Sequence, residues 1–308
     1  MEFNRTELMP GVFLSHLCSD KFKTACMSVT LLTQLRRETA AMNAVIPFVL
    51  RRGTTRYSDM EQLSRRMDEL YGAAVEPVVR RIGEIQCIGF YGSFPEPDYL
   101  PGGEALLGDT CALMAQLLLD PVTRGGLLLP QYVDSEREKL LDIIRSRMND
   151  KRSYALTRCI EEMCCYEDFA VSRFGSESEA ENIHYKKLTR HYRELIQTCP
   201  VEIFYCGKTD FKAVSAAMRD AFSAMPRGEI DYDIGTDLRM NAVEDHVRFV
   251  EEEMDVTQGK LSMGWRCDTD DVPAMIMANL LFGGTSNAKL FLNVREKLSL
   301  CYYASSSY

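Results

Sequence analysis

The sequence feature that most constrains the fold is the string Leu281–Tyr303, LFGGTSNAKLFLNVREKLSLCYY. Apolar residues at helical spacing precede it, and Gly283-Gly284 can adopt the left-handed backbone that commonly ends a helix. A polar residue at 285–287 can cap a second helix over about 288–297, whose apolar residues lie on one side. Alternating residues over 298–308 favour a short strand. The string therefore predicts a helix, a glycine break, a second helix and a strand.

The composition is that of a folded soluble protein. The chain has 308 residues, of which 46% are hydrophobic and 26% charged, and its net charge is -9. This length is typical of about two domains. The acidic balance argues against a nucleic-acid partner, which would normally require a basic face. The N-terminus has no basic-then-apolar leader, and no apolar run approaches the ~20 residues of a membrane span. We therefore expect a cytoplasmic protein without a membrane or nucleic-acid partner.

The cysteine pattern also indicates a reducing compartment. Eleven cysteines are present, and most stand singly inside apolar elements rather than at framework spacings. We expect reduced thiols packed in the core, including Cys26, Cys87, Cys111, Cys206 and Cys301. The one cluster, Cys159, Cys164 and Cys165, has no zinc-site spacing and is interpreted as helix packing.

Periodicity along the chain predicts an α+β fold. Predicted strands, with period-two alternation or β-branched residues, span 24–35, 74–80, 84–90 and 201–206. Predicted helices, with caps or helical apolar spacing, span 38–52, 58–70, 104–119, 130–148, 154–165, 189–197 and 210–225. This order favours a mainly antiparallel sheet of about six strands with helices packed on one face.

A composition break divides the chain into two predicted domains. Residues 1–225 form the first, and the polar, proline- and glycine-containing stretch 226–244 is interpreted as a linker. Residues 245–308 begin a second domain, with predicted strands at 247–252 and 260–265. Because so short a segment cannot enclose a core of its own, we expect this domain to be incomplete and to continue beyond Tyr308.

The string at 281–303 resembles the block "GG-x-x-S-x-L-F-x-x-(L/V)-R-E-K-x-x-L-x-Y" of M16 (insulinase/processing-peptidase) half-molecules. The resemblance implies an M16/LuxS-like metallohydrolase fold in which the α+β domain is repeated. Arg295 and Tyr302 match the arginine and tyrosine of the block. In the family these two residues hold the peptide backbone near a zinc ion, so the resemblance implies that both bind substrate.

The zinc motif of active M16 members is degenerate in this chain. The resemblance places their HxxEH motif at 44–48, where two histidines would bind zinc and a glutamate would activate water. The corresponding residues here are Ala44, Pro47 and Phe48. The third ligand position falls near Ile143 if Glu136-Arg137 is the matching pair. We therefore expect no metal, no cofactor and no peptidase activity from this chain alone.

Two other features of the sequence bear on the site. Pro47 removes a backbone hydrogen bond, so it should kink or segment its helix. The chain has four histidines. His184 and His191 are seven residues apart, which would separate them by ~10 Å on one helix, so they are interpreted as surface or cap residues.

Two functions remain open. In the first, the chain is a non-catalytic subunit that pairs with an HxxEH-bearing M16 paralogue and lends Arg295 and Tyr302 to a peptide or unfolded polypeptide substrate. In the second, it is a purely structural M16-like scaffold. Stretches such as IPFVLRRGTTRYSDMEQLSRRMDELYGA are most similar to bacterial M16-like proteins associated with aminopentanol modification of elongation factor P. That resemblance implies action beside an HxxEH-bearing partner.

Overall fold

The structure, a computed structural model, describes residues 2–237, 239, 246–267 and 269–308. It divides into two compact units. The first comprises Met1–Asp237 with Gln258–Met263, and the second comprises Leu238–Thr257 with Gly264–Tyr308. Each unit is described by itself below.

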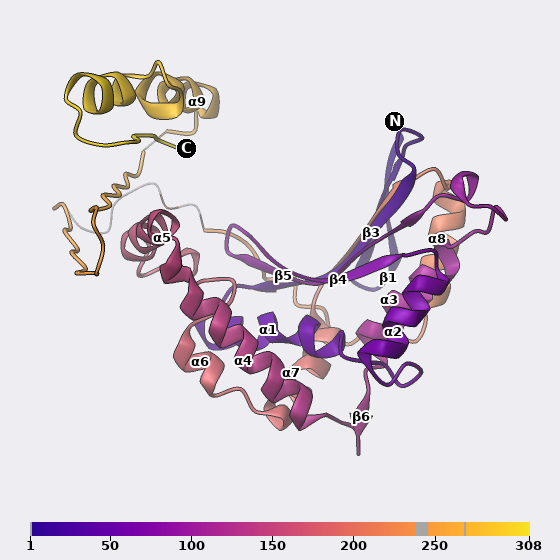
Figure 1. Ribbon diagram of the computed structural model, residues 1–308. Helices are drawn as coiled ribbons and strands as arrows, with labels where there is room; N and C mark the ends of the chain where they lie inside the picture. Colours follow the sequence, from indigo (N-terminus) through magenta and orange to yellow (C-terminus); the bar gives the residue numbers. More distant parts are fainter. Residues whose placement is uncertain (1, 238, 240–245, 268) are drawn as a thin grey trace. The chain divides into compact units, whose positions relative to one another are not determined.

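A six-stranded sheet organises the first unit (Figure 1). Its strands are β1 (Glu2–Met9), β2 (Val12–Cys18), β3 (Thr24–Gln34), β4 (Ala74–Ile82), β5 (Ile85–Pro95) and β8 (Val201–Gly207). Their spatial order is β1-β2-β8-β3-β5-β4. Neighbouring strands are antiparallel except for β2 and β8, which are parallel. The late strand β8 therefore separates two local antiparallel groups, and its insertion brings distant parts of the chain together.

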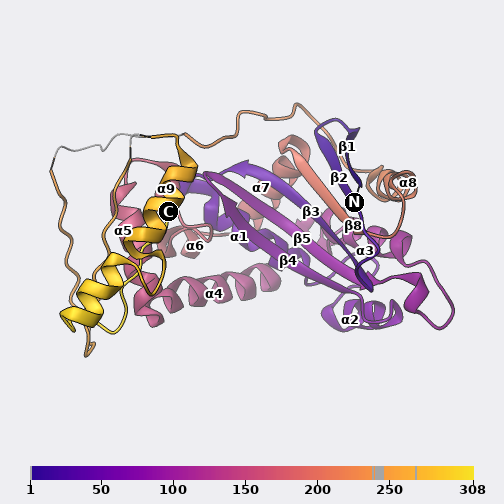
Figure 2. The same ribbon diagram turned by 90° about the horizontal axis from the view of Figure 1, so that it is seen from above.

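The helices of this unit lie on one face of the sheet or beyond its ends (Figures 1 and 2). They are α1 (Arg37–Leu50), α2 (Met60–Glu69), α3 (Leu107–Leu119), α4 (Pro130–Ser146), α5 (Lys151–Met163), α6 (Glu177–Glu181), α7 (Tyr185–Thr198) and α8 (Phe211–Phe222). Short 3-10 turns cover Pro97–Tyr99, Arg147–Asn149 and Asp168–Ala170, and β6 (Thr123–Arg124) pairs with β7 (Leu127–Leu128). In the described part of the chain, no helix is both long and apolar enough to cross a bilayer.

Alternation along the strands separates a core face from an open face. On β3, Ala25, Met27, Val29 and Leu31 are buried in the main apolar cluster. The alternate residues Cys26, Ser28 and Thr30 are only half-buried, because successive side chains of a strand point to opposite faces. We call this second side the open face. The register partners of these residues lie on the open face too, among them Glu202 and Cys206 of β8 and Tyr91 of β5. The predicted α+β fold with a mostly antiparallel sheet is confirmed.

Local capping chemistry agrees with most predicted helix ends. Asp210 accepts hydrogen bonds from the N–H groups of Lys212 and Ala213, which confirms it as the cap of α8. At α2 the cap is Asp59, not Ser58 as its predicted start implied, because the Asp59 carboxylate accepts the N–H of Gln62. Helix α1 continues through Pro47 to Leu50, so the predicted segmentation of this helix is wrong. Pro47 lies in the last turn of the helix, and its missing N–H removes only the one backbone bond to the Asn43 carbonyl oxygen.

The first residues of the stretch interpreted as a linker, 226–244, contact the rest of the first unit. The Arg227 guanidinium donates to the carbonyl oxygens of Pro10, Ile196 and Cys199. Farther on, Glu84 accepts the N–H of Asp237 at 3.2 Å. Residues 238 and 240–244 lie outside the described residues. The domain boundaries 1–225, 226–244 and 245–308 remain a prediction.

The second unit contains helical turns and extended segments. Helix α9 (Val272–Asn279) is capped by Asp271 and is followed by π-helical turns over Leu280–Gly284 and Phe291–Lys297. The described residues 246–267 and 269–308, of which Gln258–Met263 belong to the first unit, contain no strand, so the strands predicted at 247–252, 260–265 and 298–308 are wrong. Many apolar side chains of the second unit are exposed, among them Phe249, Val250, Trp265, Leu281 and Leu300. A strand requires a second strand to pair with its backbone groups, and among the described residues these segments belong to no sheet.

Candidate functional site

The four positions that the resemblance assigns to the zinc motif lie on two helices that pack together, α1 and α4. Ala44 and Pro47 are buried on α1, and Phe48 is half-buried. Ile143 on α4 is 37% exposed. None of these side chains carries the nitrogen, oxygen or thiolate sulfur that zinc requires. Among the described residues, no three or more His, Cys, Asp or Glu side chains are placed to hold a metal ion. The residues present therefore do not fit a zinc ion.

A buried carboxylate does lie on α4, but two cations neutralise it. Glu136 is 5% exposed, and its Oε1 lies 3.1 Å from Arg52 Nη1 and 2.8 Å from Lys139 Nζ. The Arg52 guanidinium also stacks over the Tyr132 ring, 4.9 Å from its centroid. A buried charge needs such partners, because burial removes its hydration. Glu136 therefore stabilises the contact between the end of α1 and α4.

A polar hydrogen-bond network is centred on Asn43, the residue directly before Ala44. Asn43 Nδ2 donates to Gln86 Oε1 at 2.8 Å, and His191 Nε2 donates to Asn43 Oδ1 at 2.6 Å. Gln86 Nε2 donates to the carbonyl oxygens of Ala40 and Arg173 at 3.0 and 2.7 Å. The network joins α1, β5 and α7 and satisfies its amide groups internally. Its residues stabilise the packing of this region.

The structure separates the roles of the histidines. His184 is exposed, and its side chain accepts the N–H of Lys186 at the start of α7, which confirms the predicted surface or cap role. The same prediction for His191 is wrong, since its ring reaches inward to Asn43. His16 is also buried, where it stacks on Tyr205. Helical periodicity places His191 near the apolar side of α7, but sequence alone gives no signal for its partner.

The half-buried position of His191 predicts a pH dependence of stability. Burial lowers the pKa of His191 in the folded chain, whereas an unfolded histidine titrates near pH ~6.5. As the pH falls below ~6.5, the unfolded state therefore binds a proton that the folded state does not, and the free energy of unfolding decreases. His191→Gln retains an N–H donor for Asn43 and does not titrate. We expect this variant to show a flatter decrease in urea-unfolding free energy from about pH 6.5 to pH 5.

The matched control is His184→Gln, which removes an exposed histidine from the same helix. It should leave the pH dependence of the unfolding free energy as in the parent chain. Equal slopes for the parent and His191→Gln would contradict the prediction.

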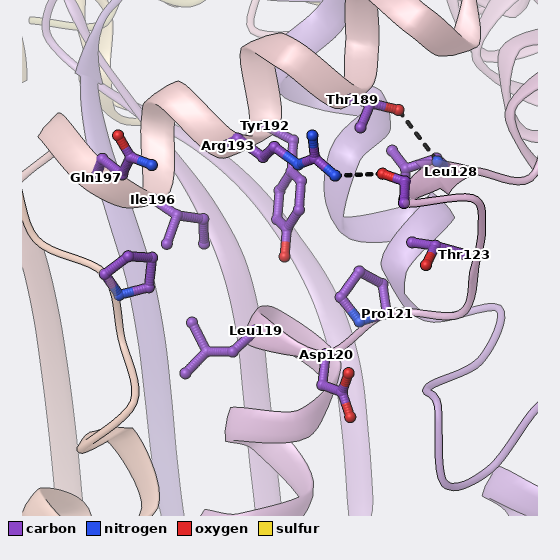
Figure 3. A pocket seen from close by; sticks show the side chains of 12 residues that line it. Leu119, Asp120, Pro121, Thr123, Leu128, Thr189, Tyr192, Arg193, Ile196 and Gln197 are labelled. Atoms are coloured by element: carbon purple, nitrogen blue, oxygen red, sulfur yellow. Dashed lines mark hydrogen bonds between the residues drawn. The ribbon is translucent and has the colours of Figure 1, made fainter.

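A hollow of about 220 Å³ lies beside α7 in the first unit (Figure 3). It is lined by the end of α3, the 120–128 hairpin, one side of α7 and Pro226. Its polar groups are largely bonded to the protein itself. Tyr192 donates its hydroxyl to Leu118 O at 2.7 Å, Thr189 accepts the N–H of Leu128 at 3.1 Å, and Arg193 donates to Gly126 O. Burial raises the pKa of Tyr192, so this hydroxyl is a poor acid. The lining offers no nucleophile–base pair.

The two residues matched to substrate contacts lie at the surface of the second unit. Arg295 belongs to the π-helical turn Phe291–Lys297. Its guanidinium stacks 4.5 Å from the centroid of the Phe291 ring, and its Nη1 lies 3.7 Å from Glu296 Oε1. Tyr302 follows at a bend outside the helical turns and is 78% exposed. Both donors are thus accessible in this unit, and their role toward substrate stays a prediction.

Comparison with known proteins identifies the family. A family model described as the peptidase M16 inactive domain matches residues 182–308. The chain is also 33% identical to the probable inactive metalloprotease YmfF of Bacillus subtilis (strain 168), over 98% of the chain and 71% of that protein. This chain belongs to the peptidase M16 family. Since the family model and the relative are both described as inactive, the chain is a non-catalytic M16 homologue.

Solved structures show the same fold. A conserved protein from Enterococcus faecalis V583 superposes with a TM-score of 0.84 at 22% identity, covering 99% of this chain and 72% of that one. A peptidase M16 inactive domain from Pseudomonas fluorescens superposes with a TM-score of 0.69 at 12% identity, covering 100% of this chain and 71% of that one. These similarities concern the M16 fold alone.

Proposed function

We propose that this M16 homologue is the non-catalytic subunit of a two-chain peptidase. Its partner is an HxxEH-bearing M16 paralogue that supplies the zinc ion. In this arrangement, the present chain contributes part of the chamber wall and places Arg295 and Tyr302 against the peptide. The observation that carries the proposal is the contrast between two sets of positions. The zinc positions have lost every ligand, while the matched arginine and tyrosine remain and their side chains are exposed.

The division of roles is chemically reasonable. When zinc-activated water attacks a peptide carbonyl, negative charge develops on the carbonyl oxygen, and fixed hydrogen-bond donors stabilise it. A tyrosine hydroxyl and an arginine guanidinium are both suitable donors. Arginine also binds carbonyl or carboxylate oxygens through a planar fork, which lysine does not have. Such donors act equally well from another chain, provided that the partner holds them at the reacting group.

The setting of this activity is part of the same proposal. The resemblance to M16-like proteins associated with elongation factor P modification favours a protein-modification or peptide-processing pathway in the cytoplasm, with a second domain that repeats the first. The free cysteines of the described chain are consistent with a reducing compartment. The alternative is an M16-like scaffold that does not contact substrate, which the exposed apolar side chains of the second unit would also suit.

Reconstitution of the two chains tests the proposal. The full-length protein and an HxxEH-bearing M16 protein from the same genome are purified separately and mixed. We expect one complex by size-exclusion chromatography, and zinc in proportion to the partner chain. Peptide cleavage by the complex should exceed that of either chain alone by at least about tenfold, because the donors complete the partner's site. A partner that cleaves equally fast alone and in the complex would favour the scaffold.

A further inference from the structure

Two cysteines from distant parts of the chain lie opposite each other on neighbouring strands of the sheet. Cys26 on β3 and Cys206 on β8 are direct register partners in an antiparallel ladder. Their neighbours Ala25, Met27 and Tyr205 are fully buried on the core face. Since strand side chains alternate, both thiols lie on the open face. Cys26 is half-buried there, and Cys206 is 9% exposed. The expectation that these two thiols are packed in the core is therefore wrong for Cys26.

The ladder sets the separation of the pair. Leu32 N–H donates to Pro200 O at 2.9 Å, so 32 and 200 are a hydrogen-bonded pair. Every second pair along the continuous register, including Cys26 and Cys206, is of the same kind. In such pairs the Cα atoms lie about 5.5 Å apart, which is within the ~4.4–6.8 Å range of disulfides. A disulfide can therefore form without strand separation.

The same geometry makes such a disulfide strained. Cβ atoms in hydrogen-bonded pairs are about 5.5 Å apart, whereas a disulfide brings them to about 3.8 Å. The bond must therefore pull the two side chains together against a rigid ladder, and strained disulfides are more easily reduced. The central position of β3 and β8 in the sheet resists relaxation. The pair is thus suited to reversible rather than permanent bonding.

The surroundings of the pair are polar and sulfur-rich. Tyr91 on the neighbouring strand β5 lies diagonally from Cys26 in the register, and it is partly exposed on the same face. Cys206 lies directly opposite Cys26 in the ladder, and Cys18 on β2 is next to Leu17, the register partner of Cys206 on its other side. Burial, followed by the contact with Cys26, raises the pKa of Cys206. Cys206 is therefore mostly protonated near neutral pH and reacts slowly. Cys26 is the more accessible of the two thiols, so we expect it to react first with a small disulfide.

We propose that Cys26 and Cys206 form a reversible redox site on the open face of the sheet, which exchanges electrons with low-molecular-weight disulfides. The proposal goes beyond the proposed subunit function and does not depend on a partner chain. In a reducing compartment the site rests as two thiols. The Cys26–Cys206 disulfide forms when the ratio of oxidised to reduced low-molecular-weight thiols rises.

The reaction balances with such a disulfide, RSSR, as the oxidant. The Cys26 thiolate attacks one sulfur of RSSR, which forms a Cys26–SR mixed disulfide and releases RS⁻. The Cys206 thiolate then attacks the Cys26 sulfur, which forms the Cys26–Cys206 bond and releases the second RS⁻. The two protein thiols lose two protons and two electrons in total. Both RS⁻ ions take up these protons, so RSSR is reduced to two RSH molecules.

Glutathione provides the probe for the test. The full chain is equilibrated in buffers of oxidised and reduced glutathione, quenched with acid, alkylated and digested with trypsin for mass spectrometry. We expect a cross-link between peptides 24–36 and 194–208 that forms under oxidising conditions and disappears when reduced glutathione is restored. Cys206 must ionise before it attacks the Cys26 mixed disulfide. Below the pKa of Cys206, the rate of this second step should therefore rise about tenfold for each unit of increase in pH.

Variants locate the bond. Cys206→Ser or, if that variant does not fold, Cys206→Ala should abolish the cross-link and leave Cys26 as a stable mixed disulfide with glutathione. A cross-link that persists in these variants would implicate Cys199, which lies in the same peptide, and would overturn the proposal. Cys159→Ser, at a half-buried cysteine of α5, is the matched control and should leave cross-linking unchanged. A bond between Cys26 and Cys18, or independent modification of Cys26 and Cys206 without a cross-link, would also overturn it.

Discussion

Tyr302→Phe should lower peptide cleavage by the reconstituted pair by ~10²-fold or more, the scale expected when one oxyanion donor is lost. The substitution removes one hydroxyl and almost no volume. Because Tyr302 is 78% exposed, folding and pairing should be nearly unchanged. The loss would appear in the activity of the partner's zinc site, although Tyr302 belongs to the other chain. The measurement is the cleavage rate of the complex, with complex formation checked separately by size-exclusion chromatography.

Tyr303→Phe is the matched control for this prediction, because it removes the same atom one residue along the chain. Tyr303 is also exposed, at 42%. Tyr303 is not matched to a substrate contact, so the control should retain parental activity. Parental rates from a Tyr302→Phe complex would instead make the scaffold the better account of the protein.

Restoring the zinc motif should destabilise the chain without restoring zinc binding. The triple variant Ala44→His, Pro47→Glu and Phe48→His places two imidazoles and a carboxylate on α1. Ala44 is completely buried, so its replacement by histidine overpacks the core by about 1–3 kcal/mol and buries a polar ring without a designed partner. Pro47→Glu adds the cost of a carboxylate at a buried position. We therefore expect a loss of several kcal/mol in the free energy of unfolding.

Zinc binding should remain below one equivalent, because Ile143 still cannot serve as the third ligand and the groups that orient histidine ligands are absent. Urea unfolding measures the stability, and elemental analysis after dialysis against chelator measures the zinc. Phe48→His alone is the control, and it should cost less than Ala44→His alone because Phe48 is only half-buried. About one zinc per chain in a triple variant of parental stability would contradict the prediction.

The sequence determined the chemistry that this chain lacks. A side chain can bind zinc only if it carries a donor nitrogen, oxygen or sulfur atom. Ala44, Pro47 and Phe48, at the positions that the resemblance assigns to the motif, carry none, so they cannot be ligands in any fold. Most helices of the first unit followed from local signals as well, such as the Asp210 cap and the apolar spacing of α7, although the short helix α6 was not predicted. These signals act within a few residues, and the long-range structure does not override them.

Strands were less predictable because a strand is stable only when another strand bonds to it. The polar strand β1 has little apolar alternation, and it was not predicted. It exists because β2 pairs with it from Phe3–Leu17 to Met9–Val12. Conversely, residues 247–252 and 260–265 alternate in sequence but form no strand in the structure. Local pattern sets the propensity of a segment for a strand, while the availability of a partner decides the outcome.

Only the tertiary structure decided which distant side chains meet. Insertion of β8 between β2 and β3 places Cys206 opposite Cys26. The packing of α7 on α1 brings His191 to Asn43, 148 positions away in sequence. Neither pair follows a local spacing, because the strand order and helix packing are set by burial of the whole apolar face. The sequence thus determined which chemical groups this M16 homologue has, and the collective packing of its core determined which of them lie together.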